Sequence, residues 1–296
     1  MYIFAGILMI EWFVSMGKLQ IISNWCSKLG STMASVARIV ILSRCRVVKF
    51  SDLSGGEQLV VLGNGPSVNK LLAEYNEFLG HRKCLAVNFS LNSDIIFRLQ
   101  PELYVLADPY FFSGRDDTRV CDLWRNLNRV SWNMTLFIPY GSELCGLLEN
   151  KNISIQRYNL TPIEGFKCFT HRAFKMGLGM PRPRNVLIAS IMLGVESGFK
   201  QIYLAGAEHS WLKDMIVDDD NRLGVAFPHF YDNGEKDVEV RYLNKTLVEE
   251  LDSLRIAFNS YHEIRAYTDT LRGVQILNIT PGSYIDAFER YSPERG

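Results

Sequence analysis

The sequence predicts an α/β protein with a Rossmann-like, mostly parallel sheet and helices on both faces. From residue 56 onward, short apolar segments typical of buried strands alternate with segments whose apolar residues recur at helical spacing. This alternation favours parallel strands, because a crossover helix must connect each strand to the next. With 296 residues and 47% apolar residues, the chain can bury a substantial core.

The first half of this pattern is regular. Residues 56–63 (GEQLVVLG) contain a continuous apolar run, LVVL, followed by a glycine, which predicts a buried strand. Strands are also expected at 83–90 (KCLAVNFS) and 102–108 (ELYVLAD). The helix between the first two strands covers 68–79, where helical spacing places five apolar side chains on one side: Val68, Leu71, Leu72, Tyr75 and Leu79.

The second half continues the alternation. The apolar segment 185–198 predicts a buried helix that ends at Gly198, since glycine is favoured just past a helix end. The other predicted elements are a helix at 115–127, strands at 135–141, 200–206 and 274–280, and a long helix at 240–261.

Two polar, irregular segments, about 160–185 and 210–240, interrupt the alternation. The first is rich in glycine and proline, which is typical of functional loops. We expect both to act as lid loops that border the functional site of a nucleotide-binding, glycosyltransferase-like domain covering residues 51–290.

Residues 1–50 have a different composition and form a predicted helical appendage. Six lysines and arginines stand against one acid, Glu11, which interrupts the opening apolar run after ten residues. A membrane-spanning helix needs about 20 apolar residues, so this run favours a helix lying on the cytoplasmic membrane surface instead. A helix that spans the membrane and a helix that packs on the domain or mediates homo-oligomer contacts are the alternatives. We therefore expect a cytoplasmic protein at the inner face of the membrane.

The charge and cysteine patterns exclude some classes of protein. The 32 basic and 32 acidic side chains cancel, which argues against a nucleic-acid partner. The six cysteines are scattered without a C-x-x-C pair or a zinc-ligand spacing. They predict reduced, buried thiols rather than disulfides.

The turn after the first strand, within VVLGNGPSVNKLL, is the first candidate site. Gly63 and Gly65 allow a sharp bend, and the following helix can offer N–H groups to an anion beside Asn64. Ser67 is placed to cap that helix. A phosphate or nucleotide is the expected ligand, although a tight turn without a ligand is the alternative.

Two further strand ends carry polar side chains. Asn88 follows the second strand, and its amide can both donate and accept hydrogen bonds. Asp108 follows the third strand, just before a proline turn. Either residue could simply form a turn. Ligands of parallel sheets bind beyond the carboxyl ends of the strands, so three polar strand ends together predict a nucleotide crevice.

These motifs give the chain a family resemblance. GNGPS, the N-F pair at Asn88, DPYFF at Asp108 and GFKQIYLAG together resemble the bacterial sialyltransferases of glycosyltransferase family 42. The resemblance covers about Leu59 to Gly206 and extends more weakly to Ile285, while the first 50 residues lie outside it. HSW and HFY are also similar to motifs of uncharacterised polysaccharide-biosynthesis proteins. The resemblance implies a CMP-activated sugar donor, a mobile lid and no metal or other cofactor.

The resemblance also implies roles for individual residues. Asn64 would contact the nucleotide phosphate and sugar, and Asn88 the cytidine and the transferred sugar. Asp108 stands where the family has an asparagine, so donor hydrogen bonds are missing there. The two phosphate-binding tyrosines of the family fall near Ser210 and are not reproduced. The expected substitutes are Tyr231 and two arginines, Arg182 and Arg184, whose guanidinium groups suit a phosphate.

Transfer to a hydroxyl requires a base, and the family uses a histidine. His229, in AFPHFYD, is the best positional match, and His209 is the rival. A purely structural histidine is the alternative at both positions. The acidic run at 217–222 (VDDDNR) suggests either a metal site or a solvated turn, and its place in a polar loop favours the turn.

The sequence thus predicts an inverting, metal-independent glycosyltransferase that moves a sialic-acid-like or other acidic sugar from a CMP donor to a surface glycan or glycolipid. Proteins of the pterin-pyrophosphokinase-like and motility-accessory type share the glycine-rich turn and the IYLAG segment. A metal-dependent nucleotide enzyme of that type is therefore one alternative. A nucleotide-binding scaffold without turnover is another.

Overall fold

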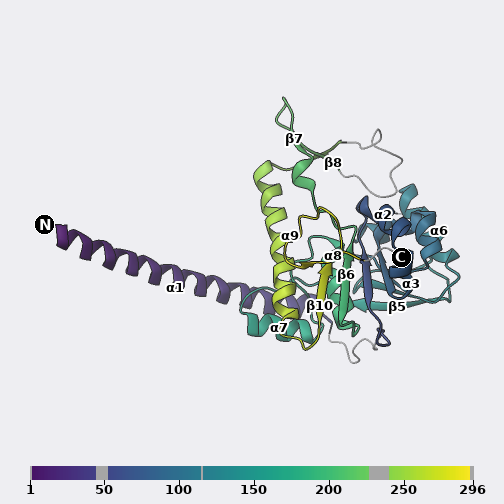
Figure 1. Ribbon diagram of the computed structural model, residues 1–296, viewed down its shortest axis with the longest axis horizontal. Coiled ribbons are helices and arrows are strands. Elements are labelled where there is room, and N and C mark those ends of the chain that lie inside the picture. Colours follow the sequence, from purple (N-terminus) through teal and green to yellow (C-terminus); the bar gives the residue numbers. More distant parts are fainter. Residues whose placement is uncertain (1, 45–52, 115, 227–239, 294–296) are drawn as a thin grey trace.

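The computed structural model describes residues 2–44, 53–114, 116–226 and 240–293, without the side chains of residues 2–19, 226, 240 and 241. Its centre is an eight-stranded sheet with every neighbouring pair parallel, as predicted (Figure 1). The strand order is β11-β10-β6-β1-β2-β3-β4-β5. The strands are β1 (Leu59–Leu62), β2 (Lys83–Val87), β3 (Leu103–Val105), β4 (Met134–Pro139), β5 (Ile153–Tyr158), β6 (Gln201–Ala205), β10 (Gln275–Asn278) and β11 (Glu289–Arg290).

Helices cover both faces of this sheet. Leu59 and Val61 of β1 point into one apolar core and Val60 and Leu62 into the other, so the whole strand is buried. This explains why its sequence is continuously apolar rather than alternating. The first core contains residues of α7 (Lys167–Lys175), α8 (Val186–Glu196) and α9 (Leu247–Thr268). The second contains residues of α2 (Ser67–Glu74), α3 (Asn76–Gly80), η1 (Asn88–Asn92), α4 (Asp94–Leu99), α5 (Tyr110–Ser113) and α6 (Thr118–Arg129).

Local sequence signals set the ends of the helices. The Asn185 side chain caps α8 by accepting hydrogen bonds from the backbone N–H groups of Leu187 and Ile188. Gly198 follows this helix with φ of 95°, as its predicted role requires. The helix predicted at 68–79 is interrupted at Tyr75, which separates α2 from α3.

The chain reverses direction across the sheet at one place. From β1 it builds β2 to β5 outward on one side, and then returns to place β6 on the other side of β1. Such a switch point leaves a crevice beyond the carboxyl ends of the two central strands, where ligands of this class of fold bind.

The described part of the segment 210–240 is more regular than predicted. It contains η2 (Trp211–Lys213) and two strands, β7 (Met215–Val217) and β8 (Leu223–Ala226), which form an antiparallel sheet with β9 (Val240–Leu243). Because β9 takes its first residues, the long helix predicted at 240–261 starts only at Leu247, after a capping box at Thr246. In the acidic run between β7 and β8, Asp218 accepts hydrogen bonds from Arg222 and closes a turn.

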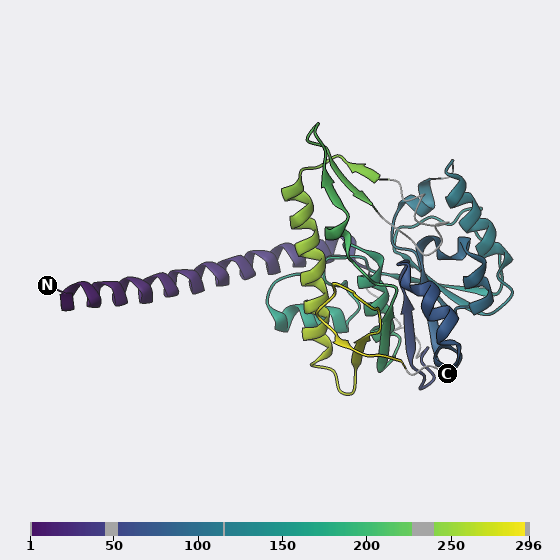
Figure 2. The same cartoon turned by 45° about the horizontal axis from the view of Figure 1, so that its top comes forward.

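A 41-residue helix, α1 (Tyr2–Leu42), projects from the domain (Figures 1 and 2). The N-terminal appendage is thus helical, as predicted, and at 1.5 Å per residue it is about 60 Å long. Among the helices searched within the described residues, none meets the length and apolarity of a membrane span.

The prediction of buried cysteines is wrong for most described positions. Cys84 of β2 is buried, and that burial raises the pKa of its thiol. Four others lie on helix or loop surfaces and are exposed: Cys26, Cys121, Cys145 and Cys168.

Candidate functional site

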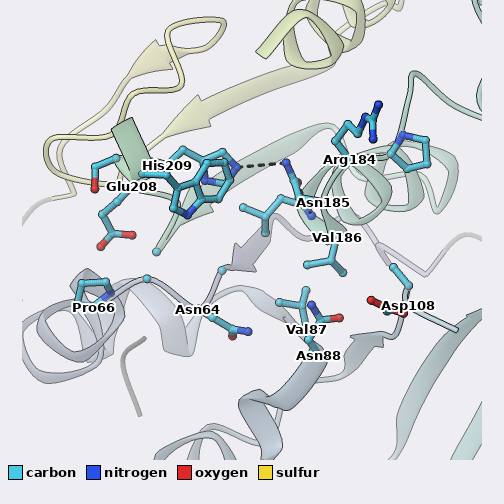
Figure 3. Close-up of a pocket in the computed structure, with 18 of the residues that line it drawn as sticks. Asn64, Pro66, Val87, Asn88, Asp108, Arg184, Asn185, Val186, Glu208 and His209 are labelled. Carbon is cyan, nitrogen blue, oxygen red and sulfur yellow. Dashed lines mark hydrogen bonds between the residues drawn. The ribbon is translucent and has the colours of Figure 1, made fainter. Parts of the chain in front are cut away.

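A cavity of about 490 Å³ lies beyond the carboxyl ends of β1, β2, β3 and β6, at the switch point. It gathers several residues that the sequence predicted separately. Asn64, Asn88 and Asp108 lie along one side of it, and Asn185 and His209 lie opposite (Figure 3). Of the predicted residues, it is lined by Gly63, Asn64, Gly65, Asn88, Asp108, Arg184, His209 and Ser210.

The turns after β1 and β6 are hydrogen-bonded to each other at the base of this cavity. The Gly63 N–H donates to the Ala205 carbonyl at 2.8 Å, and the Gly65 N–H donates to the Gly206 carbonyl at 2.9 Å. A Cβ on Gly63 would lie 2.2 Å from the Gly206 oxygen. The glycines are therefore required by the close approach of two backbones.

Glu208 occupies the position that the sequence assigned to an anion. Its Oε1 accepts a hydrogen bond of 2.7 Å from the Ser67 N–H, at the start of α2. The Gly65 N–H is also bonded, so in this structure the N–H groups of Gly65 and Ser67 both have partners within the protein. The Oε2 of Glu208 is buried and has no hydrogen-bond partner among the described residues. A Cβ on Gly65 would lie 1.5 Å from that oxygen, so glycine makes room for the carboxylate.

Ser67 does not cap α2 as predicted. Pro66 is the cap residue, and its own side chain makes no capping hydrogen bond. The Ser67 Oγ is buried without a described hydrogen-bond partner, and the residue lines a neighbouring cavity beside Lys70 and Asn278. The carboxylate of Glu208 supplies the acceptor that a capping serine would otherwise supply.

Asn64 and Asn88 bring side-chain amides to the cavity. The Oδ1 atom of each is buried and lacks a hydrogen-bond partner within the described chain. Asn88 adopts the left-handed conformation, with φ of 51°, which is uncommon outside glycine. The buried Tyr104 hydroxyl donates a hydrogen bond to the Asn88 carbonyl and holds this conformation. Unpartnered buried polar atoms and unusual backbone geometry are frequent at binding sites.

Asp108 lies exposed at the rim. Its Oδ1 accepts a hydrogen bond of 2.9 Å from the Tyr110 N–H, so the carboxylate shapes the turn into α5. The residue also lines the cavity. Asp108 therefore both forms the turn and lines the cavity, so the two alternatives considered for it do not exclude each other.

The structure separates the two arginines. Arg184 lines the cavity just before the start of α8, and no ion pair to it is found among the described residues. Arg182 lies 2.7 Å from the Glu164 carboxylate through its Nε and borders another cavity between α1 and α9. Only Arg184 is placed to contact a ligand of the main cavity.

His209 lines the cavity and is itself buried, with 8% of the residue exposed. Its backbone is left-handed, with φ of 48°. Its Nε2 lies 2.7 Å from the Tyr261 hydroxyl, which donates to the capping Asn185 Oδ1 at 2.9 Å. Its ring packs against Trp211 with centroids 4.2 Å apart.

Burial lowers the pKa of His209 to about 3. The imidazole is therefore neutral near pH 7 and a weak base, whereas an efficient catalytic base has a pKa near the working pH. These contacts favour the structural alternative for His209. His229 and Tyr231 lie outside the described residues, so their predicted roles stay predictions.

Among the polar and aromatic residues that line the cavity, the sequence analysis missed four: Asn185, Glu208, Trp211 and Asp214. Asn185 carried a signal, because asparagine directly before an apolar helical segment is a typical cap. Glu208 follows the end of β6 by only a few residues, which is where the switch point places functional side chains.

The described residues contain no group of three histidine, cysteine or acidic side chains that could hold a metal ion. The three cavity acids, Asp108, Glu208 and Asp214, therefore do not form such a cluster.

Comparisons with known proteins add little to this geometry. No protein-family model and no curated protein matches the chain, so the resemblance to sialyltransferases rests on the quoted motifs. Among solved structures, the chain is similar to the MAf glycosyltransferase from Magnetospirillum magneticum AMB-1, with a TM-score of 0.44 and 14% sequence identity. The match covers 91% of this chain and 38% of the other, so this chain spans well under half of its length.

Proposed function

We propose that this protein is a glycosyltransferase that moves a sialic-acid-like or other acidic sugar from a CMP-activated donor to a hydroxyl of a glycan or glycolipid acceptor. The observation that carries the proposal is the convergence of four strand ends on one cavity at the switch point of a parallel sheet. The cavity volume of about 490 Å³ lies in the range of small-molecule sites.

The charges around the cavity favour a donor with one phosphate. Arg184 is the only cationic residue among the described residues of the lining, and three acids, Asp108, Glu208 and Asp214, also line it. A nucleoside diphosphate brings more negative charge than one guanidinium can offset, whereas the single phosphodiester of a CMP-sugar suits one arginine. The amides of Asn64 and Asn88 supply hydrogen bonds to ribose, base or sugar.

The reaction is a single displacement. The acceptor oxygen attacks the anomeric carbon, the bond from that carbon to the phosphate oxygen breaks, and CMP leaves with the electron pair. The configuration at the anomeric carbon inverts. Arg184 offsets the charge on the departing phosphate.

The acceptor proton must pass to a base. His229 is the base that the sequence predicts. Among the described cavity residues, Glu208 is the alternative, because its Oε2 is a carboxylate oxygen without a partner.

A thermal-shift panel tests the donor. CMP, CDP, UDP, GDP and ATP are compared with EDTA and with magnesium, since a ligand that binds the folded state raises the melting temperature. We expect CMP to give the largest rise, unaltered by EDTA. Stabilisation by ATP only with magnesium would instead support the pyrophosphokinase-like alternative. No response to any nucleotide would overturn the proposal.

Turnover of CMP-sugars identifies the base. His229→Ala is compared with Glu208→Gln, which keeps the shape of the side chain but removes the carboxylate, and with His209→Gln. The base variant should retain CMP-induced stabilisation and lose at least about a hundredfold in kcat. CMP binding by the wild-type protein without turnover on any acceptor would favour the scaffold alternative.

A further inference from the structure

Helix α1 contacts its own domain through polar side chains and through two apolar ones, since Ile39 packs against the first core and the ring centroids of Trp25 and Phe166 are 5.2 Å apart. The Ser35 hydroxyl is buried and donates to the Glu164 carbonyl at 2.9 Å, while the Thr32 hydroxyl accepts from the Phe166 N–H at 3.1 Å. Ser43, just past the helix end, donates to the Leu178 carbonyl at 2.6 Å. A surface helix normally turns its apolar face to the core and its polar face to water. In the described part of α1, by contrast, most of the large apolar side chains are exposed.

Apart from the contact of Trp25 with Phe166, the apolar face of α1 is largely uncovered by the described chain. Met33 is 66% exposed and Val40 is 76% exposed. Six exposed side chains recur every three or four residues and so lie along one side of the helix. This apolar stripe consists of Ile22, Trp25, Leu29, Met33, Val36 and Val40 and is about 27 Å long.

The charges of this region favour one kind of occupant for the stripe. Residues 12–51 contain no aspartate or glutamate, but they contain six cationic residues: Lys18, Lys28, Arg38, Arg44, Arg46 and Lys49. A second copy of α1 would bring the same positive charges, whereas paired helices usually flank their apolar seam with opposite charges. An anionic lipid surface offers both an apolar layer for the stripe and negative charge for the cations.

We propose that α1 lies on an anionic bilayer surface with the apolar stripe in the lipid. The start of the helix agrees with this position, since Glu11 is the only charged residue between residues 2 and 17. The proposal does not depend on the chemistry of the cavity, because the stripe and the cavity share no residue. It places the domain beside a membrane through a helix that the domain itself holds by polar contacts.

Flotation of the full chain with vesicles tests the proposal. Phosphatidylcholine vesicles are compared with vesicles that also contain phosphatidylserine. The stripe variant is Met33→Glu with Val40→Glu. Its matched control is Val248→Glu with Leu251→Glu, at positions 72% and 44% exposed on α9.

We expect the wild-type protein and the control to float with the anionic vesicles, and the stripe variant to lose at least about tenfold in bound fraction. Binding of the wild-type protein should fall at high salt, because salt screens the attraction to lipid headgroups. An unchanged melting temperature of the stripe variant shows that the domain is still folded.

Two results would overturn the proposal. One is equal flotation of the stripe variant and the wild-type protein, which would exclude the stripe as the binding surface. The other is a wild-type protein that binds neither type of vesicle but forms a dimer by light scattering, with the stripe variant monomeric. That result would make a second copy the occupant.

Discussion

Glu208 accepts a hydrogen bond of 2.7 Å from the backbone N–H of Ser67, although 141 residues separate them in the chain. The carboxylate thereby joins the turn after β1 to the turn after β6, beside the two backbone hydrogen bonds between these turns. Both turns contribute to the base of the cavity, so this contact couples the shape of the cavity to the start of α2. Four predictions follow from contacts around the cavity.

Gly65→Ala should displace Glu208, because the new Cβ would lie 1.5 Å from its Oε2 and 2.7 Å from the Gly206 carbonyl oxygen. We expect a loss of about 1–3 kcal/mol in the free energy of unfolding, the usual cost of overpacking. Urea denaturation measures this loss. Gly80→Ala, where nothing lies within 4 Å of the new atom, is the control and should be nearly neutral. Combination with Glu208→Ala should be less than additive, since the two positions are in contact.

Arg184→Ala should weaken CMP binding about ten- to a hundredfold, because a hydrogen bond to a charged phosphate is lost. Arg182→Ala is the matched control, since its guanidinium pairs with Glu164 and borders a different cavity. Isothermal titration with CMP measures both dissociation constants. Equal weakening by the two changes would contradict the assignment of Arg184 to the phosphate.

Tyr104→Phe should affect both stability and binding. The hydroxyl donates to the Asn88 carbonyl and accepts from the Leu91 N–H, and its loss leaves buried groups unpaired at a cost of about 1–3 kcal/mol. Tyr158→Phe removes another buried hydroxyl, which donates to the Leu106 carbonyl at 3.1 Å. Both variants should unfold more easily, but only Tyr104→Phe should reduce CMP affinity, because it releases the backbone of Asn88. The same affinity in the two variants would argue against this positioning role.

His209 should make stability depend on pH below neutrality. Burial lowers the pKa of His209 to about 3 in the folded protein, whereas an ordinary histidine in the unfolded chain has a pKa near 6.5. Between these values the unfolded chain binds a proton that the folded protein does not bind. The stabilisation is therefore complete above about pH 6.5 and is lost as pH falls toward 3, by up to about 1.4 kcal/mol per pH unit.

Urea denaturation at pH 7, 6 and 5 measures this dependence. His209→Gln should flatten this pH dependence, because the substituted side chain does not titrate. An identical slope in His209→Gln and the wild-type protein would show that His209 is not the group responsible.

Local patterns predicted most of the fold. The continuous apolar run of β1, the glycine after α8 and the apolar period of α9 each depend on residues close together in the sequence, so they could be identified without the structure. The start of α9 was misplaced because the residues of β9 fit the helical period by chance. Strand β5 was missed because its burial pattern has buried residues only at its two ends.

The sequence predicted where in the fold the candidate site lies, but not the hydrogen-bond partners of its residues. Asn64, Asn88 and Asp108 were found because the ends of parallel strands lie at one edge of a sheet. The partner of the first turn could not be found in this way. GNGPS alone indicates exposed N–H groups, and the carboxylate that binds one of them lies 141 residues further along the chain. The separation of Arg182 from Arg184 depends in the same way on Glu164, a partner that no local motif indicates.

The pairing of β1 with β6 has a consequence during synthesis of the protein. The contact between Gln58 and Gln201 beside these strands spans 143 residues, so a nascent chain carries β1 for a long time before its second neighbour is translated. Until then one edge of the central strand is open to pairing with other chains. Truncated chains that end before residue 200 should therefore aggregate, and no nucleotide should rescue them, because the site does not exist before β6 is in place.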